Sequence, residues 1–427
     1  MPSPTPTLTI RDIEGFLREH RLSSTDSGRV GVEVEWLTFH ADNPVERVVP
    51  AQMVGALEEL GGLPSKGSVT FEPGGQLELS TIAHPGITKA TAALADDRAA
   101  IRGALVTQGI ELVAIGFDPV RSMQRVLDAP RYEAMESHFD AAGTDGRSMM
   151  CGTAAIQVSV DFNGPTPVEE RWRLAHEIGP VVAAAFANSP LRCSPSGEVE
   201  PSGFRSTRLA TWAAMDSSRT SPVLNGNGNG HAGGSDLASS WLRYALDAQV
   251  MLIRSKRERY EPIVDPLPFR RWIEQGHELG YPTLGDFEYH LTTLFPPIRP
   301  SGRLELRMID TVGDPWWRAA VALVTAMLDD GEAAEVASLA IEKGGVRAAW
   351  DNAALHALDD PALAKSAMKC FDAALDALPR LGADKETLDA SAEFVDRYVA
   401  RGRCPADDLL DTWRRGESLA ATFELGS

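Results

Sequence analysis

Glutamates alternate with apolar residues in Gly31-Val32-Glu33-Val34-Glu35-Trp36. Side chains point to opposite faces of a strand with a period of two residues, so Glu33 and Glu35 share one face and the apolar residues share the other. The pattern predicts a strand over 29–39 with one packed face and one acidic face. Glutamate is depleted in strands and like charges on one face repel, so these carboxylates require a positive partner.

A second acidic segment is Glu72-Pro73-Gly74-Gly75-Gln76-Leu77-Glu78-Leu79. Pro-Gly-Gly predicts a turn, which places two short strands within 68–82. Period two puts Gln76 and Glu78 together, opposite Leu77 and Leu79. The Glu78 carboxylate therefore shares its strand face with the Gln76 amide.

The third segment, Gly302-Arg303-Leu304-Glu305-Leu306-Arg307, adds a carboxylate between two arginines on one strand face. For any one of the three segments, a strand that turns its polar side to water is an equally good explanation. In combination, carboxylates suited to a hard divalent cation beside guanidinium groups suited to phosphate are typical of phosphoryl transfer.

These segments resemble strands of the glutamine synthetase fold. Segment 72–78 is similar to a pair of strands in that fold that carries a glutamate, then Gly-Gln, then a second glutamate. Segment 303–307 is similar to its R-x-E-x-R strand. Spacing and order resemble more narrowly the glutamate-cysteine ligases of the plant and bacterial type, especially the actinobacterial branch that supplies ergothioneine synthesis. Further similar motifs lie at 116–119, 131–135, 149–161, 187–190 and 208–212, with Asp216 and Arg219 following.

The resemblance implies an ATP-dependent ligation of L-glutamate to L-cysteine through a γ-glutamyl phosphate. It implies two or three Mg²⁺ ions, for which Mn²⁺ can substitute, with Glu35, Glu72 and Glu78 near the substrate carboxylate. Glu33 and Glu305 are expected nearer the ATP phosphates. Arg307 and Arg303 are expected to stabilise the transferring phosphoryl group.

The same resemblance suggests substrate contacts. Gln157 stands where the broader fold offers a histidine to the metal, so we expect it to contact substrate or bind metal weakly. A polar loop holds three candidates for the glutamate carboxylate, and later residues line the acceptor or nucleotide side. The candidates are Arg121, Arg131, Tyr132, Thr153, Arg208, Trp212 and, for the nucleotide, Arg219 and Arg303. Surface charge explains Arg121 equally well, and core packing explains Trp212 slightly better than a substrate contact does.

Composition excludes several classes of protein. The chain has 427 residues, 43% apolar and 24% charged, with a formal charge of -19. This charge argues against nucleic acid and anionic membranes as partners. A signal peptide and a membrane-spanning apolar run are not evident, so a cytoplasmic protein that binds small molecules is expected, as a monomer or small homo-oligomer. The four cysteines show no C-x-x-C pairing and are expected to be free thiols.

The order of elements predicts an α+β fold in which an antiparallel acidic sheet is followed by helices. We expect a lead-in helix within 1–27, a catalytic domain over 28–314 with a flexible Gly/Asn-rich loop over 217–240, and a helical region over 315–427. Strands are predicted over 29–39, 68–82, 111–116, 154–162 and 302–310, and helices over 9–21, 50–60, 86–108 and 167–188.

Two other functions stay open at this point. One is a related carboxylate-amine ligase that takes a different amine. The other is a metal-binding or regulatory relative without activity, which the presence of all five glutamates and both flanking arginines disfavours. Phosphate release that depends on which amine is supplied distinguishes a ligase for a different amine from a glutamate-cysteine ligase. Turnover of ATP with any amino acid excludes a relative without activity.

Overall fold

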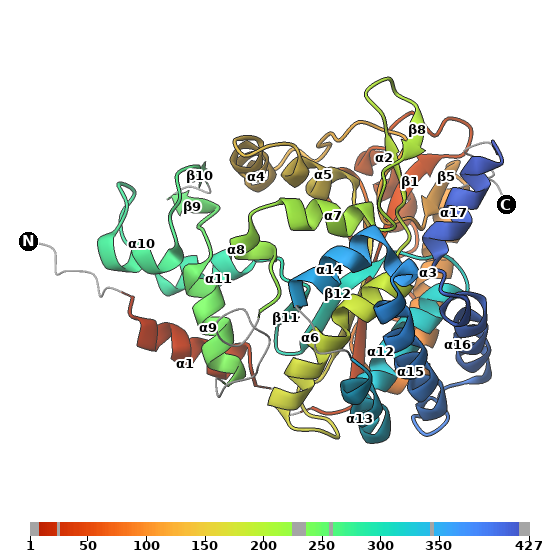
Figure 1. The fold of residues 1–427 in the computed structure, drawn as a ribbon. Coiled ribbons are helices and arrows are strands. Elements are labelled where there is room, and N and C mark those ends of the chain that lie inside the picture. Colours follow the sequence, from red (N-terminus) through yellow and green to blue (C-terminus); the bar gives the residue numbers. More distant parts are fainter. Residues whose placement is uncertain (1–7, 24–25, 224–235, 256–258, 342–345, 418–427) are drawn as a thin grey trace, which may run out of the picture.

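A computed structural model describes residues 8–23, 26–223, 236–255, 259–341 and 346–417 (Figure 1). At its centre is an eight-stranded antiparallel sheet in the order β11-β12-β6-β1-β3-β2, and β4 and β5 also pair with β1. Its strands are β1 Arg29–His40, β2 Ser68–Phe71, β3 Leu77–Ser80, β4 His84–Pro85, β5 Ile110–Val113, β6 Ala155–Val160, β11 Ile298–Pro300 and β12 Leu304–Asp310. Two small hairpins are β7 Leu191–Cys193 with β8 Val199–Pro201, and β9 Leu252–Ser255 with β10 Arg259–Pro262.

The register of the sheet brings the acidic residues of separate segments together. Glu35 pairs with Glu78 across β1 and β3, and Glu33 pairs with Gln157 across β1 and β6. Glu305 of β12 lies opposite Ser159 of β6, and the pairing shifts between Leu306 and Ile309. One sheet face therefore collects the carboxylates, as the period-two pattern predicted.

Helices precede and interrupt the sheet. A capping box at Thr9 and Asp12 starts the first of them, where the Thr9 hydroxyl accepts from the Asp12 backbone N–H at 3.2 Å. The helices up to the last strand are α1 Ile10–His20, α2 Pro50–Glu58, α3 Gly86–Val106, α4 Pro130–Asp140, α5 Asp145–Gly152, α6 Val168–Ala185, α7 Thr207–Ala214, α8 Ser217–Thr220, α9 Leu237–Asp247, α10 Phe269–Gln275 and α11 Leu284–Leu291.

After the last strand the described chain is helical, as predicted. These helices are α12 Trp316–Asp329, α13 Gly331–Ala340, α14 Val346–Leu355, α15 Pro361–Ala377, α16 Lys385–Arg397 and α17 Pro405–Arg414, with short 3₁₀ turns at Ala357–Asp359 and Val399–Arg401. In Figure 1 they gather on one side of the molecule, and α14 lies between α6 and α7, which it contacts.

The packed face of the sheet forms the core. Val30, Val32, Val34 and Trp36 are at most 2% exposed. Helix α3 packs against β1, α6 against β12, and α12 against β6, so three helices cover this face. The opposite face holds the carboxylates, and the predicted α+β arrangement is confirmed. Within the described residues, no helix is both long enough and apolar enough to span a bilayer.

Two segments differ from the expectation. Arg131 and Tyr132 are not in a polar loop but begin α4, because Pro130 occupies the first turn of a helix, where its missing N–H costs nothing. Of the expected loop over 217–240, the ends are helical, in α8 and α9, and Asp236 caps α9 by accepting from the Ser239 N–H at 2.7 Å. The middle of that loop, 224–235, lies outside the described residues.

Candidate active site

A cavity of about 300 Å³ opens over the acidic face of the sheet, and we call it the acidic cavity. Strands supply its floor, while α4, α5, α7 and the segment before β11 supply its walls. Its lining residues are Glu33, Glu35, Glu72, Pro73, Gln76, Glu78, Arg131, Tyr132, Met135, Met149, Met150, Thr153, Gln157, Arg208, Trp212, Thr292, Phe295, Arg299 and Arg307.

Three carboxylates form a cluster in this cavity. One carboxylate oxygen from each of Glu35, Glu72 and Glu78 lies within 4.8 Å of the others. Backbone and side-chain donors fix two of them, since Glu35 accepts from the Ala155 N–H at 2.8 Å and Glu78 accepts from the Ser80 hydroxyl at 2.9 Å. An all-oxygen donor set of this kind fits a hard divalent cation.

The electrostatics of the cluster also require a cation. Burial and then the charge of Glu78 raise the pKa of Glu35 to about 7, and burial followed by the charges of Glu35 and Glu78 raises the pKa of Glu72 well above its usual value. Burial, Glu305 and Glu78 raise the pKa of Glu33 to about 7. Carboxyl groups that resist ionisation this strongly gain their charge at neutral pH when a metal ion is bound.

Glu305 is in a different environment. It is 3% exposed and accepts from Arg299 Nη2 at 2.8 Å, from the Ser301 hydroxyl at 2.9 Å and from Arg307. Although burial opposes ionisation, the Arg299 and Arg307 guanidinium groups lower the pKa of Glu305 to about 2. Glu305 is absent from the lining of the acidic cavity, so its expected role as a metal ligand stays a prediction.

Gln157 joins the carboxylate cluster to the arginine. Its amide N–H donates to Glu35 Oε1 at 3.2 Å, and its amide oxygen accepts from Arg307 Nη1. An amide can do both at once because it carries a donor and an acceptor. Gln157 therefore lines the cavity as expected, and it also orients two groups that are expected to act on the substrate.

Arg131, Tyr132 and Thr153 all line the acidic cavity. The Arg131 guanidinium stacks over the Tyr289 ring at 5.0 Å, which holds it at the rim. The Thr153 hydroxyl donates to the Met149 carbonyl at 2.7 Å, so toward a substrate it acts as an acceptor. Donation from the Thr153 hydroxyl to a substrate would require that internal hydrogen bond to break.

Arg208 belongs to α7, is 3% exposed, and extends its guanidinium to β12. Its Nη2 donates to the Arg307 carbonyl at 2.7 Å, and its Nη1 is 3.7 Å from Asp310 Oδ1. Asp310 is held in turn by the Ser189 hydroxyl at 2.6 Å and the Ser206 hydroxyl at 3.0 Å. This buried network positions Arg208 beside Arg307 at the edge of the acidic cavity.

Two expected site residues lie elsewhere. Arg121 is buried, donates from Nε to Asp118 at 2.7 Å and from Nη1 to the Thr38 carbonyl at 2.8 Å, and is absent from the lining of the acidic cavity. Arg303 donates to Asp161 at 2.9 Å and is also absent from that lining. Both guanidinium groups are committed to a carboxylate of the protein.

Arg219 is also not a free ligand for a nucleotide. It is fully buried, with Nε donating to Asp216 at 3.0 Å, Nη1 to the Thr293 carbonyl at 2.9 Å and Nη2 to the Gln249 carbonyl at 3.0 Å. A guanidinium with this many internal acceptors ties segments of the chain together. Arg219 therefore ties α8 to the segment before β11 and to the segment after α9.

Glycine allows the loop with Glu72 to approach a neighbouring helix. A Cβ atom added at Gly74 would lie 2.2 Å from the Cys151 carbonyl oxygen, and Gly75 has a φ of 91°. Gln76, which follows, donates to the Thr153 carbonyl at 3.0 Å. This loop is thus anchored to α5 and the start of β6, which sets the position of Glu72.

Sequence reasoning missed Arg299 and the apolar wall of the cavity. Arg299 pairs directly with Glu305 across the hairpin of β11 and β12. The turn at Ser301-Gly302 was the available signal, because a hairpin there places residues 299 and 305 opposite each other. No local pattern indicated that Met135, Met149 and Phe295 meet at one wall.

Comparisons with known proteins identify the family of the chain. The family model for glutamate-cysteine ligase family 2 (GCS2) matches residues 29–424. The chain is 40% identical over 402 residues to the glutamate-cysteine ligase EgtA of Mycolicibacterium smegmatis, covering 93% of this chain and 90% of that protein. It is 27% identical to the chloroplastic glutamate-cysteine ligase of Arabidopsis thaliana, over 98% and 83% of the two chains. The crystal structure of a glutamate-cysteine ligase from Francisella tularensis in complex with AMP shares the fold, with a TM-score of 0.55, 13% identity and coverage of 94% and 88%.

Proposed function

The chain belongs to glutamate-cysteine ligase family 2 and is an ATP-dependent ligase, and we propose that its acidic cavity joins the γ-carboxylate of L-glutamate to the amine of L-cysteine. The observation that carries the proposal is the Glu35, Glu72 and Glu78 cluster within reach of Arg307 through Gln157. Condensing an amine with a carboxylate in water is uphill, so the carboxylate must first be activated by ATP. The product is γ-glutamylcysteine, which the similarity to EgtA connects with ergothioneine synthesis.

Divalent cations fit the acidic cavity. Glu35, Glu72 and Glu78 would hold one, and Mg²⁺ is the expected ion, with Mn²⁺ as a substitute. Glu33 and Glu305 are the proposed ligands of a second ion nearer the ATP phosphates, where Arg299 and Arg307 also donate to Glu305. When bound, such ions neutralise the phosphate oxygens and polarise the substrate carboxylate.

In the first step, an oxygen of the glutamate γ-carboxylate attacks the γ-phosphorus of ATP. A new O–P bond forms, the bond from that phosphorus to the β–γ bridging oxygen breaks, and ADP leaves. Arg307 is the proposed stabiliser of the transferring phosphoryl group. Its Nε has no hydrogen-bond partner among the described residues, and its Nη1 is fixed by Gln157 and Glu305, which supports this role.

In the second step, the amine of the acceptor attacks the γ-carbonyl carbon of the acyl phosphate. The C–N bond forms, the C–O bond to phosphate breaks, and the nitrogen loses a proton. The apolar wall at Met135, Met149 and Phe295 limits the access of water to the acyl phosphate, which would otherwise hydrolyse. Arg131 and Arg208, at the rim and at the edge of the cavity, are the proposed partners of substrate carboxylates.

The test is phosphate release from Mg-ATP and glutamate with a panel of amines, combined with mass detection of the product. Release with cysteine and a mass of γ-glutamylcysteine supports the proposal. Release only with another amine keeps the mechanism and changes the acceptor. No release with any combination points to a binding or regulatory protein and overturns the proposal.

A further inference from the structure

Asp310, at the end of β12, is a buried carboxylate outside the acidic cavity. It is 1% exposed and absent from the lining of that cavity. Its hydrogen-bond donors are the Ser189 hydroxyl at 2.6 Å, the Asn188 backbone N–H at 2.9 Å and the Ser206 hydroxyl at 3.0 Å. A Cβ atom added at Gly116 would lie 2.6 Å from Asp310 Cγ, so a larger residue there would displace the carboxylate. The sequence motifs at 116–119 and 187–190 therefore meet at Asp310.

The two serines connect Asp310 to the first turn of α7. The Ser189 hydroxyl accepts from the Arg208 backbone N–H at 3.3 Å, and the Ser206 hydroxyl accepts from the Leu209 backbone N–H at 3.1 Å. Each hydroxyl thus accepts from the helix and donates to the carboxylate, which suits an ionised group that only accepts. The position of α7 therefore depends on Asp310.

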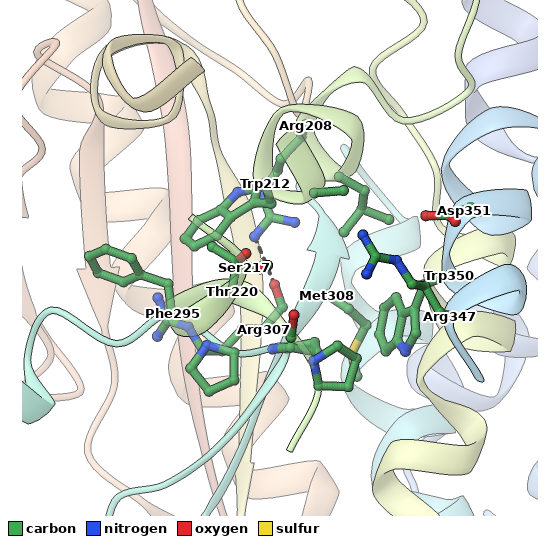
Figure 2. A pocket seen from close by; sticks show the side chains of 16 residues that line it. Arg208, Trp212, Ser217, Thr220, Phe295, Arg307, Met308, Arg347, Trp350 and Asp351 are labelled. Atoms are coloured by element: carbon green, nitrogen blue, oxygen red, sulfur yellow. Dashed lines mark hydrogen bonds between the residues drawn. The ribbon is translucent and has the colours of Figure 1, made fainter. Parts of the chain in front are cut away.

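Helix α14 holds the start of α7 from another side. The Ala354 carbonyl, near the end of α14, accepts from the Ser206 backbone N–H at 3.0 Å. The same helix brings Arg347 and Trp350 to a cavity of about 340 Å³ that adjoins the acidic cavity at Arg208 (Figure 2). The C-terminal helices therefore help to determine where α7, and with it Arg208, lies relative to the site.

Strand β12 is irregular at Arg307. Its pairing with β6 shifts between Leu306 and Ile309. Arg307 and Met308 together oppose the single residue Gln157, which makes this a β-bulge. A bulge redirects the side chains beside it, so the backbone of Arg307 determines where its guanidinium points.

Arg208 holds the backbone of this bulge. Its Nη2 donates to the Arg307 carbonyl at 2.7 Å (dashed in Figure 2), and its Nη1 lies 3.7 Å from Asp310 Oδ1. The Arg307 backbone N–H donates to the Pro297 carbonyl at 2.9 Å. Burial raises the pKa of Asp310, and the charge of Arg208 is the largest effect that opposes this rise. Arg208 and Asp310 thus form a buried ion pair whose guanidinium ties α7 to the bulge.

We propose that Asp310 is a positioning residue for phosphoryl transfer. Through Arg208 it fixes the backbone of Arg307 at the bulge, and so sets the direction from which the Arg307 guanidinium meets the transferring phosphoryl group. The inference rests on the proposed function, in which Arg307 stabilises that group. A misplacement of about 1 Å at a reacting group can cost about 10²-fold in rate, so a residue outside the cavity can affect catalysis.

The test uses Asp310→Asn, which removes the charge that pairs with Arg208 and conserves volume. The kcat with glutamate and cysteine should fall about tenfold. The ratio of kcat for ATP to kcat for ATPγS, in which sulfur replaces a γ-phosphoryl oxygen, should fall about threefold, because the arginine contact with that group is weakened. Arg307→Lys, which alters the contact directly, should change this ratio in the same direction. The ratio does not depend on the fraction of folded protein, so a purely structural effect leaves it unchanged.

Asp118→Asn is the matched control. Asp118 is also 1% exposed and pairs with an arginine, Arg121, outside the acidic cavity. The nucleotide ratio of this variant should equal that of the wild type. A second comparison places Asp310→Asn in an Arg208→Gln background, where it should lower kcat less than about twofold further, because Asp310 acts through Arg208.

A wild-type nucleotide ratio in Asp310→Asn would overturn the proposal, as would a full further loss of kcat in the Arg208→Gln background. If Asp310→Asn does not fold, Ser189→Ala decides, because it keeps the carboxylate and removes one of its donors. A lowered ratio in Ser189→Ala supports the proposal, and a wild-type ratio overturns it. Failure of the proposed function itself is distinguishable, because the wild-type protein would then release no phosphate from ATP with glutamate and cysteine.

Discussion

Glu35 and Glu305 lie on the same face of one sheet, two strands apart, and their surroundings differ sharply. Two arginines and a serine satisfy Glu305, and its pKa falls to about 2. Glu35 shares its space with two other carboxylates, and its pKa rises to about 7. The difference shows that residue type alone does not set the charge state of a carboxylate, because two arginines pair with Glu305 whereas Glu35 lies among other carboxylates.

The largest expected effect comes from the unpaired cluster. Glu35→Gln should lower kcat by about 10²–10³-fold, because it removes a charge needed for metal binding and conserves volume. Activity measured against Mg²⁺ concentration checks this. The exposed Glu46→Gln is the control. Normal activity of Glu35→Gln at low Mg²⁺ would remove Glu35 from the ligand set.

Arg307 and Arg303 provide the next comparison. Arg307→Lys should lower kcat about 10²-fold, because lysine lacks the planar two-point geometry that a phosphoryl group matches. Arg303→Lys should lower kcat less than about tenfold, because Arg303 pairs with Asp161 outside the acidic cavity. Steady-state kinetics of both variants check the ranking. Equal losses would restore Arg303 to the phosphate site predicted from the sequence.

Glu305→Gln tests the carboxylate that is paired with Arg299 and Arg307. It leaves the partly buried Arg299 and Arg307 without their shared buried carboxylate, so the free energy of unfolding should fall by about 3 kcal/mol. Its Mg²⁺ dependence should change less than that of Glu35→Gln. Urea unfolding and Mg²⁺ titration measure the two quantities. If Glu305→Gln shifts the Mg²⁺ dependence of activity as far as Glu35→Gln does, Glu305 is a metal ligand.

The smallest effect is on stability as a function of pH. The folded-state pKa of Glu35 is raised, so between its unfolded pKa near 4.5 and about 7 the folded state binds more protons than the unfolded state. This group therefore destabilises the metal-free protein increasingly as pH rises through that window. Buried His176, with a pKa lowered to about 4, acts in the opposite direction below pH 6.5. Because His176 is present in both proteins, comparing the variant with wild type at the same pH cancels its contribution.

Glu35→Gln should raise the Tm of the metal-free protein at pH 8 relative to wild type, by a few degrees for about 1–2 kcal/mol. At pH 5, where the Glu35 carboxyl is protonated in the folded protein, the two Tm values should agree more closely. Calorimetry with and without Mg²⁺ checks this. A variant that is equally destabilised at both pH values would show that the charge of Glu35 does not cost stability.

The strands that hold the carboxylates were predictable because their signal is local. Alternation in 31–36 and 302–307 determines which side chains share a face, and that geometry is set within a few residues. The environment of Arg121 was not predictable, because its partners Asp118 and Thr38 come from a turn and from the distant strand β1. The local sequence around an arginine in a polar segment is the same whether its guanidinium binds a substrate or a buried carboxylate of the protein.

The sequence by itself determined the acidic face, the α+β order of elements, the family and the residue types available for metal and phosphate. The tertiary structure alone decided which carboxylates stay unpaired, since Arg299 reaches Glu305 through the β11–β12 hairpin. It also decided that α14 brings Arg347 and Trp350 to the edge of the site. The reason is physical: periodicity fixes the direction of a side chain, whereas charge neutralisation and cavity shape depend on contacts between residues far apart in the chain.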